Sequence, residues 1–224
     1  MRRFYVALLP WAAFDASMRS DGLDLAWGAS LALGMGVTVF ALNIRPRRPL
    51  PLDMFALVLF TTLLVSGLAT GSGNPLGSSA RSVASLALGA FLLLTARAAP
   101  DIRMSLAEIV PPRRHDRAQI PGAAHRLTRV WATTFVGIAA LDESGALAPS
   151  DVAKTLFGWL LPIAVILVVA RWSALSLAKR FDLDGPVSID LANFIWSAGR
   201  TRSDGHRSTR PALRLYRGGE DHPS

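Results

Sequence analysis

The chain has 224 residues, 51% of them hydrophobic, with 24 Lys and Arg against 16 Asp and Glu, and it contains no cysteine. The lack of cysteine excludes a disulfide framework, a thiolate metal site and a cysteine nucleophile. The length fits one ordinary soluble domain, but the apolar residues are gathered in long runs with almost no internal charge. A bilayer core of ~30 Å is crossed by ~20 helical residues, whereas a soluble helix would carry polar residues every three or four positions. The composition therefore predicts an all-α, polytopic membrane protein.

Six apolar runs have the length expected of transmembrane helices. The first contains Pro10 and Asp15 and follows Arg2 and Arg3, a start that also suits a signal peptide. No small-x-small cleavage site follows it cleanly, which favours an uncleaved first helix. The six predicted helices span approximately residues 4–18, 23–44, 54–70, 78–96, 127–141 and 152–177.

The clearest part of this pattern is a helical hairpin in the middle of the chain. The third and fourth runs are joined by an uncharged turn rich in Gly, Ser and Asn, from Thr70 to Ser78. After the six runs, residues 181–200 have apolar side chains at helical spacing and predict an amphipathic helix on the membrane surface. The remaining tail, 201–224, has no apolar periodicity and is predicted to be a disordered cytoplasmic segment.

The positions of the basic residues predict the orientation in the membrane. An even number of crossings puts both termini on one side, and all but three of the 24 Lys and Arg lie on that side. The exceptions are Arg19, Arg81 and Lys154. The positive-inside rule then places both termini in the cytoplasm. The basic cytoplasmic face is also suited to anionic lipids.

Ionisable residues within the apolar runs are the first candidates for function, because a charge at membrane depth is costly. The candidates are Asp15, Arg81 and Lys154, each about one turn from the predicted outer interface. In one interpretation Asp15 and Arg81 converge on a polar cavity that opens to the outside. In the other, which we favour, Asp15 pairs with Arg19 four residues on, while Arg81 and Lys154 extend to the lipid headgroups.

Small residues at intervals of four predict close helix packing, because they allow two backbones to approach each other. The second run has two such pairs and the fourth run has one. The candidate packing residues are Gly28, Ser30, Gly34, Gly36, Ser85 and Gly89.

Signatures of enzymatic chemistry are missing. The sequence has no His, Cys or carboxylate cluster at metal-ligand spacing, no phosphate-binding glycine loop that opens a helix, and no nucleophile with an evident base. We therefore expect no enzyme activity, no catalytic residue, no metal site and no cofactor. Binding of nucleic acid by the Arg-rich tail is disfavoured, because no folded module or interleaved aromatic residue accompanies the arginines.

Two short patterns resemble a known group of proteins. Gly71-Ser72 precedes Arg81-Ser-Val-Ala-Ser-Leu-Ala-Leu-Gly89, and Arg126-Leu-Thr-Arg-Val-Trp131 opens the fifth helix. Together they resemble uncharacterised six-helix bacterial inner-membrane proteins that are distantly similar to the intracellular septation protein family. The resemblance covers residues 4–180. It implies a small multi-pass protein associated with upkeep or division of the cell envelope, and it brings no catalytic residues with it.

Two functions fit these observations. The first is a non-enzymatic partner or scaffold that acts through its membrane-embedded surface, on lipid, on another membrane protein or on a second copy of itself. The alternative is a small transporter or channel with a polar cavity near Asp15 and Arg81. A filled helical bundle with an exposed small-residue face would favour the first, and a polar cavity that reaches the middle of the membrane would favour the second.

Overall fold

The computed structural model describes residues 2–19, 24–44, 50–71, 79–107 and 114–181. These residues are almost entirely helical, and no β-strand occurs among them. All of them belong to one compact unit, residues 1–187. The predicted amphipathic helix of 181–200, apart from Phe181, and the predicted tail of 201–224 lie outside the described residues.

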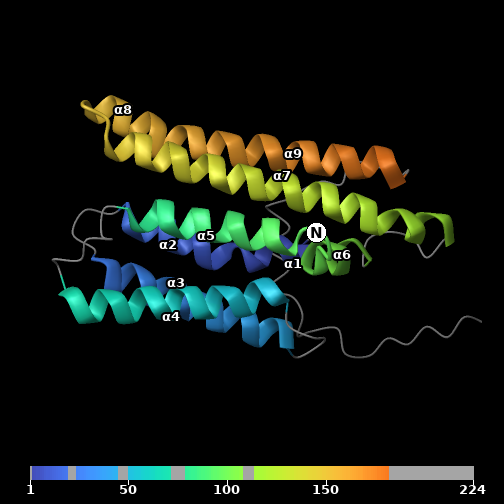
Figure 1. Ribbon diagram of the computed structural model, residues 1–224, viewed down its shortest axis with the longest axis horizontal. Helices are drawn as coiled ribbons and strands as arrows, with labels where there is room; N and C mark the ends of the chain where they lie inside the picture. Colours follow the sequence, from blue (N-terminus) through green and yellow to red (C-terminus); the bar gives the residue numbers. More distant parts are fainter. Residues whose placement is uncertain (1, 20–23, 45–49, 72–78, 108–113, 182–224) are drawn as a thin grey trace, which may run out of the picture. The chain divides into compact units, whose positions relative to one another are not determined.

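The helices run side by side along most of their length (Figure 1). Two groups of neighbours account for most of the packing: α2, α3 and α4 form one, and α5, α7 and α9 form the other. In chain order the helical segments are α1 (Arg2–Ala7), α2 (Leu9–Met18), α3 (Leu25–Ile44), α4 (Pro51–Thr70), α5 (Ala80–Thr95), α6 (Pro100–Ala107), α7 (Arg114–Ala146), α8 (Asp151–Thr155), the π-helix η2 (Leu156–Leu160) and α9 (Leu161–Phe181).

The first predicted helix is interrupted at Leu8, between α1 and α2. Pro10 lies in the first turn of α2, where its missing N–H costs nothing because the first turn of a helix has no internal acceptor for it. A second interruption follows α5, where the chain bends by 72° between α5 and α6. Ala99, directly before Pro100, has a φ of 39° at this bend. The bend places α6 against α7 and α1.

The fifth helix is much longer than predicted, and its predicted start at Leu127 is wrong. Helix α7 begins at Arg114, well before the predicted start. Buried Ile120, Ala123 and Ala124 continue the helical spacing of the apolar run toward the amino terminus. Pro121 lies on the exposed side of the helix, where its ring does not disturb the core.

Three helical stretches are long and apolar enough to cross a membrane: Leu25–Asn43, Pro51–Thr70 and Asp151–Phe181. The bent pair α5 and α6 adds a fourth if it is counted as one span. Large apolar side chains on these helices are exposed, among them Leu68, Leu94, Val58, Leu167 and Val168. The described chain is thus an all-α protein with three or four helices suited to a membrane.

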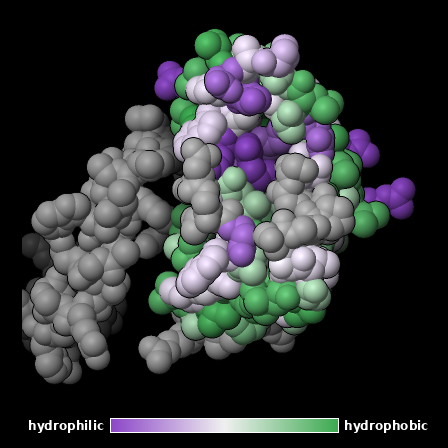
Figure 2. Space-filling model, turned by 90° about the vertical axis from the view of Figure 1, so that its left-hand side faces the viewer, coloured by the Kyte–Doolittle hydropathy of each residue, from purple (hydrophilic) through white to green (hydrophobic). Residues whose placement is uncertain are grey.

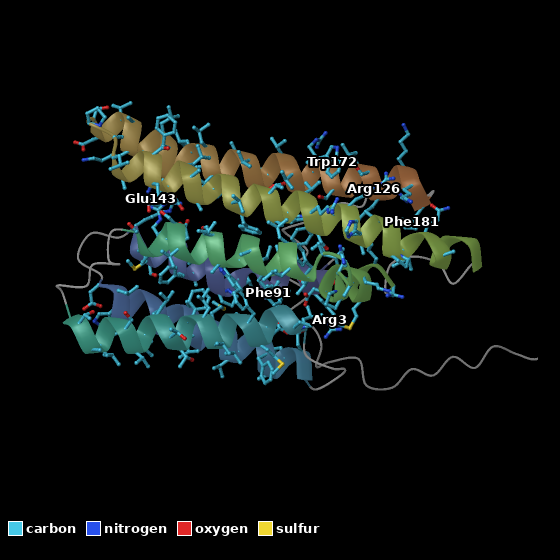
Figure 3. The ribbon with its side chains drawn as sticks, viewed as in Figure 1. Arg3, Phe91, Arg126, Glu143, Trp172 and Phe181 are labelled. Atoms are coloured by element: carbon cyan, nitrogen blue, oxygen red, sulfur yellow. The ribbon has the colours of Figure 1, made fainter. Side chains whose placement is uncertain are left out.

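The interior between the helices is filled with aromatic and aliphatic side chains. Trp131 of α7 is buried and makes edge-on ring contacts with Phe4 and Tyr5 of α1. Phe55 of α4 stacks on Phe91 of α5 with 4.3 Å between ring centroids, which joins the two helix groups. Such aromatic pairs contribute about 0.5–1.5 kcal/mol each beyond the area that they bury. Figure 3 shows Phe91 directed toward the interior.

Glycines mark several close helix contacts. A Cβ at Gly28 would lie 2.7 Å from Met18 Sδ of α2, and a Cβ at Gly89 would lie 3.0 Å from the Ala132 carbonyl of α7. Gly36 meets Leu57 at ordinary contact distance. Gly34 has no atom within 4 Å of its Cβ position, so the close contact predicted there is absent from the described chain. An interval of four shows that two small residues share a face, but it does not show which face meets a neighbour.

Ser30 and Ser85 are half-buried. The hydroxyl of Ser30 donates to the Ala26 carbonyl of its own helix, 2.7 Å away. The sequence analysis did not select Gly67 of α4, whose Cβ position lies 2.8 Å from the Ala26 backbone nitrogen of α3. Gly67 thus allows α4 to approach the backbone of α3 closely.

Candidate functional site

A cluster of charged side chains joins the two helix groups at one end of the bundle. Asp15, in the last turns of α2, accepts hydrogen bonds from Arg19 Nε at 2.8 Å and from Arg81 Nε at 2.9 Å. Arg81 comes from the first turn of α5. The structure therefore combines features of both interpretations: Asp15 pairs with its neighbour in α2 and also with Arg81 across the bundle.

Asp142 is the functional candidate that the sequence analysis missed. The fifth predicted helix ended one residue before it, but Asp142 lies within α7, four residues before the end of the helix. Its side chain is only 2% exposed, and its Oδ1 accepts a hydrogen bond from Arg81 Nη2. Buried Phe135 and Ile138 precede it at helical spacing. This spacing of apolar residues in the sequence could have indicated that Asp142 lies on the same buried face of the helix.

The cluster balances two cations with two anions, which explains how these groups tolerate burial. Arg19 and Arg81 face Asp15 and Asp142, with side-chain exposures of 3%, 20%, 40% and 2% respectively. A buried charge that lost its partner would be strongly unfavourable. Arg81 also donates to the Gly158 carbonyl at 2.9 Å, which adds the π-helix η2 to the cluster.

The π-helix approaches α7 unusually closely at this point. A Cβ on Gly145 of α7 would lie 3.1 Å from the Gly158 backbone nitrogen, so the two glycines allow the backbones to meet. Trp159, the next residue of η2, places its ring 4.6 Å from the guanidinium carbon of Arg19. This is a cation–π contact. Single π-helical turns within α-helices occur frequently at functional sites.

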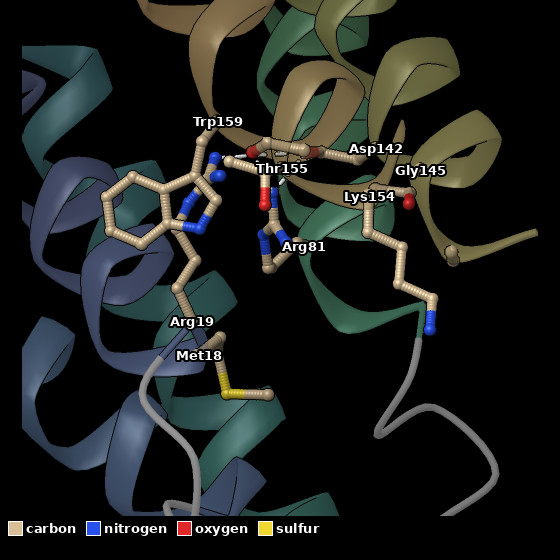
Figure 4. Close-up of a pocket in the computed structure, with 11 residues that line it drawn as sticks. Met18, Arg19, Arg81, Asp142, Gly145, Lys154, Thr155 and Trp159 are labelled. Carbon is tan, nitrogen blue, oxygen red and sulfur yellow. Dashed lines mark hydrogen bonds and ion pairs between the residues drawn. The ribbon is translucent and has the colours of Figure 1, made fainter. Parts of the chain in front are cut away.

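A cavity of about 270 Å³ opens beside the charged cluster. Figure 4 shows Arg19, Arg81 and Asp142 converging on one side of it, with Trp159 next to Arg19. Viewed from this end of the molecule, hydrophilic residues gather in a hollow that is flanked by apolar residues (Figure 2). The lining residues come from α2, α5, α7, α8 and η2.

Lys154, the third predicted candidate, also lines this cavity but is not part of the buried cluster. Its side chain is exposed, and Nζ pairs with Asp151 Oδ1 at 3.2 Å within α8. Asp151 is almost fully exposed, so this pair contributes little stability. Figure 4 shows the Lys154 side chain extending away from the buried Arg81–Asp142 pair.

The opposite end of the bundle has a second set of buried polar groups. Asp53 accepts hydrogen bonds from Asn43 Nδ2 at 2.8 Å and from the Leu50 backbone N–H at 3.1 Å. Asp101 of α6 accepts one from the Leu52 backbone N–H at 3.1 Å. The two carboxylates thus bind free N–H groups at the start of α4, the usual role of acidic residues at a helix amino terminus.

Among the described residues, no group of three or more His, Cys, Asp or Glu lies close enough together to hold a metal ion. The charged cluster offers guanidinium donors from Arg19 and Arg81 and carboxylate acceptors from Asp15 and Asp142. Such an arrangement is suited to binding and to holding helices together.

Comparison of the chain with models of protein families, with curated proteins and with solved structures finds no match. The site is therefore interpreted from its own geometry alone.

Proposed function

We propose that the protein is an integral membrane protein of the bacterial inner membrane that acts as a non-enzymatic partner or scaffold in the cell envelope. In this proposal the chain crosses the membrane six times, with α1 and α2 together as the first crossing and both termini in the cytoplasm. The observation that carries the proposal is an interior filled with apolar side chains beneath an exposed apolar surface.

The filled interior supports a partner rather than a conduit. Phe14, next to Asp15, is buried, and so are Ala84 and Ile138, one turn inward from Arg81 and Asp142. Further along the same helices, Leu88 and Trp131 are also buried. The polar cavity is lined by residues at helix ends, and these apolar side chains lie between it and the middle of the bundle.

Exposed small residues support contacts with other membrane components. Thr133, Gly137, Ala140 and Ser144 are exposed along one face of α7, and the Cβ position of Gly137 has no neighbouring atom within 4 Å. In a membrane, small residues at this spacing allow a second helix to approach closely. The basic residues that flank the predicted cytoplasmic ends support the orientation, and the link to the cell envelope rests on the resemblance noted in the sequence.

A small transporter or channel is the second candidate, and the cavity beside the Asp15–Arg81 pair favours it. It requires a second conformation in which the polar path extends inward past Leu88. The two functions therefore differ in whether the middle of the bundle ever becomes accessible to water.

Single-cysteine labelling tests the topology and the filled interior together, because the chain has no native cysteine. With a membrane-impermeant maleimide on intact spheroplasts, we expect Ser72→Cys to react and Ser203→Cys to react only after lysis. Leu88→Cys should remain unlabelled in both states. Reaction of Ser203→Cys from outside would refute the orientation, and reaction of Leu88→Cys would favour the transporter.

The partner role is tested by the size of the complex in which the protein leaves the membrane when it is extracted without detergent. We expect the wild-type chain to migrate as a complex larger than its own 24.0 kDa mass and bound lipid allow. Gly137→Leu should shift it toward the monomer, because the side chain would block close approach of a helix without disturbing the fold. Leu94→Ala on exposed α5 is the control. A monomeric wild-type protein would refute the proposal.

A further inference from the structure

The cavity at the charged end of the bundle has unused hydrogen-bonding groups of both kinds. Arg19 Nη1 is buried and has no hydrogen-bond partner among the described residues, and the same is true of Asp142 Oδ2. Both residues line the cavity, and their side chains are 3% and 2% exposed. A buried polar atom without a partner is costly and rare, so two of them beside one cavity indicate a ligand.

The two guanidinium groups converge on the same position. A Cβ at Gly158 would lie 3.9 Å from Arg81 Nη1 and 4.0 Å from Arg19 Nη1. The hydrogen bonds that Arg81 makes within the described chain use its Nε and Nη2. Glycine at 158 thus leaves room for an acceptor atom next to two guanidinium nitrogens. Lys154 adds an ammonium group to the cavity lining.

We propose that this cavity binds the phosphate group of a phospholipid headgroup, with the phosphate oxygens accepting hydrogen bonds from Arg19 and Arg81. Guanidinium groups present their donors in a fixed planar arrangement that matches an oxyanion such as phosphate. Asp142 Oδ2 then accepts a hydrogen bond from a donor in the same headgroup, such as the ammonium of phosphatidylethanolamine. In this way one headgroup gives a hydrogen-bond partner both to Arg19 Nη1 and to Asp142 Oδ2.

A lipid is favoured over a soluble phosphate compound by the surface next to the cavity. Trp159 lines the cavity and is 44% exposed, and it is followed by the exposed Leu160. Val152 and Leu156 extend the same exposed apolar surface along α8 and η2. A headgroup in the cavity therefore has an apolar path beside it for its acyl chains. This inference rests on the proposed membrane insertion, because it places the ends of α2, α5 and α7 at headgroup depth.

The test uses the full-length chain, purified in detergent, and its thermal unfolding temperature as a function of added lipid. Phosphatidylethanolamine should raise this temperature, because a ligand that binds only the folded state stabilises it. Diacylglycerol, which has the acyl chains but no phosphate, should not. Glycerophosphoethanolamine and inorganic phosphate form the soluble arms. An equal rise with either of them would confirm the phosphate site and assign its ligand to the soluble class.

Gly158→Ala is the decisive variant. Its methyl group meets its neighbours at ordinary contact distance, so the variant should fold, but the methyl occupies the space for the phosphate. We expect half-maximal stabilisation to require at least about tenfold more lipid, the effect of one lost charge-assisted hydrogen bond. Gly137→Ala, at an open position on α7, is the matched control and should respond like the wild type.

Lys154→Gln of α8 is the second variant, with Lys179→Gln in the last turn of α9 as its control. Lys154 is exposed, so folding should be unaffected and the lipid requirement should rise up to about fivefold. Equal stabilisation by diacylglycerol, or an unchanged lipid requirement in both Gly158→Ala and Lys154→Gln, would overturn the inference. A chain that alkaline carbonate washes from the membrane would instead refute the proposed function, so the two failures are distinguishable.

Discussion

The contribution of Arg81 to stability gives the sharpest test of the charged cluster. Arg81→Met keeps most of the side-chain volume but removes both ion pairs, and it leaves Asp142 buried without its main partner. Removing one member of a buried pair costs about 3–5 kcal/mol. Arg81 is 20% exposed, and Arg19 Nη2 remains 3.9 Å from Asp142 Oδ1. Since both features reduce the penalty, we expect a loss of about 2–3 kcal/mol.

The assay is equilibrium unfolding in mixed micelles, followed by circular dichroism, with Arg171→Met on the exposed face of α9 as the control. A double-mutant cycle separates the ion pair from other effects of the substitution: in Arg81→Met/Asp142→Asn the neutral amide no longer requires a cation. We therefore expect the double variant to lose about 1–2 kcal/mol less stability than the two single variants lose together. A loss below about 0.5 kcal/mol for Arg81→Met, or simple additivity in the cycle, would refute the structural role of the cluster.

Two further predictions concern helix packing. Gly89→Ala should destabilise the protein by about 1–3 kcal/mol, because its methyl group would meet the backbone of α7. Gly137→Ala, the control, should be neutral or slightly stabilising. Equal effects of the two substitutions on thermal unfolding would contradict the packing of α5 on α7. Asp101→Ala should cost about 1–2 kcal/mol, because it removes the acceptor for an N–H at the start of α4. The same unfolding measurement checks it, with exposed Asp151→Ala as the control, and equal stability of these two variants would show that the cap contributes nothing.

The helices were predictable where long apolar runs end in charges or turns. The helices predicted at 54–70 and 78–96 appear as α4 (Pro51–Thr70) and α5 (Ala80–Thr95). The pairing of the helices was not predictable, because α4 packs mainly on α3 and α5 mainly on α7. An apolar helix for a membrane has hydrophobic residues on every side, so its sequence carries little information about which side meets a neighbour.

The site was predicted in part. Asp15 and Arg81 stood out because charges are rare in apolar runs, and the structure brings them into contact. Asp142 was missed because a Gly, Ser and Pro-containing segment beyond it was interpreted as the end of the helix. Helix α7 continues to Ala146 because Asp142 extends the buried face of Phe135 and Ile138. Its charge is compensated by Arg81, 61 positions away along the chain, and local patterns do not reveal a partner at that distance.

The two helix groups meet along contacts whose chemistry changes with depth. Between the two ends they are joined by apolar contacts such as the Phe55–Phe91 stack, which lies near the end where α4 begins. At one end Asp101 of α6 binds the start of α4, and at the other Arg81 of α5 binds Asp15 of α2. Charges are least costly where helices end, because water and headgroups remain within reach. A ligand that is recognised by charge is therefore accommodated at an end of this bundle, while the filled middle keeps the two groups together.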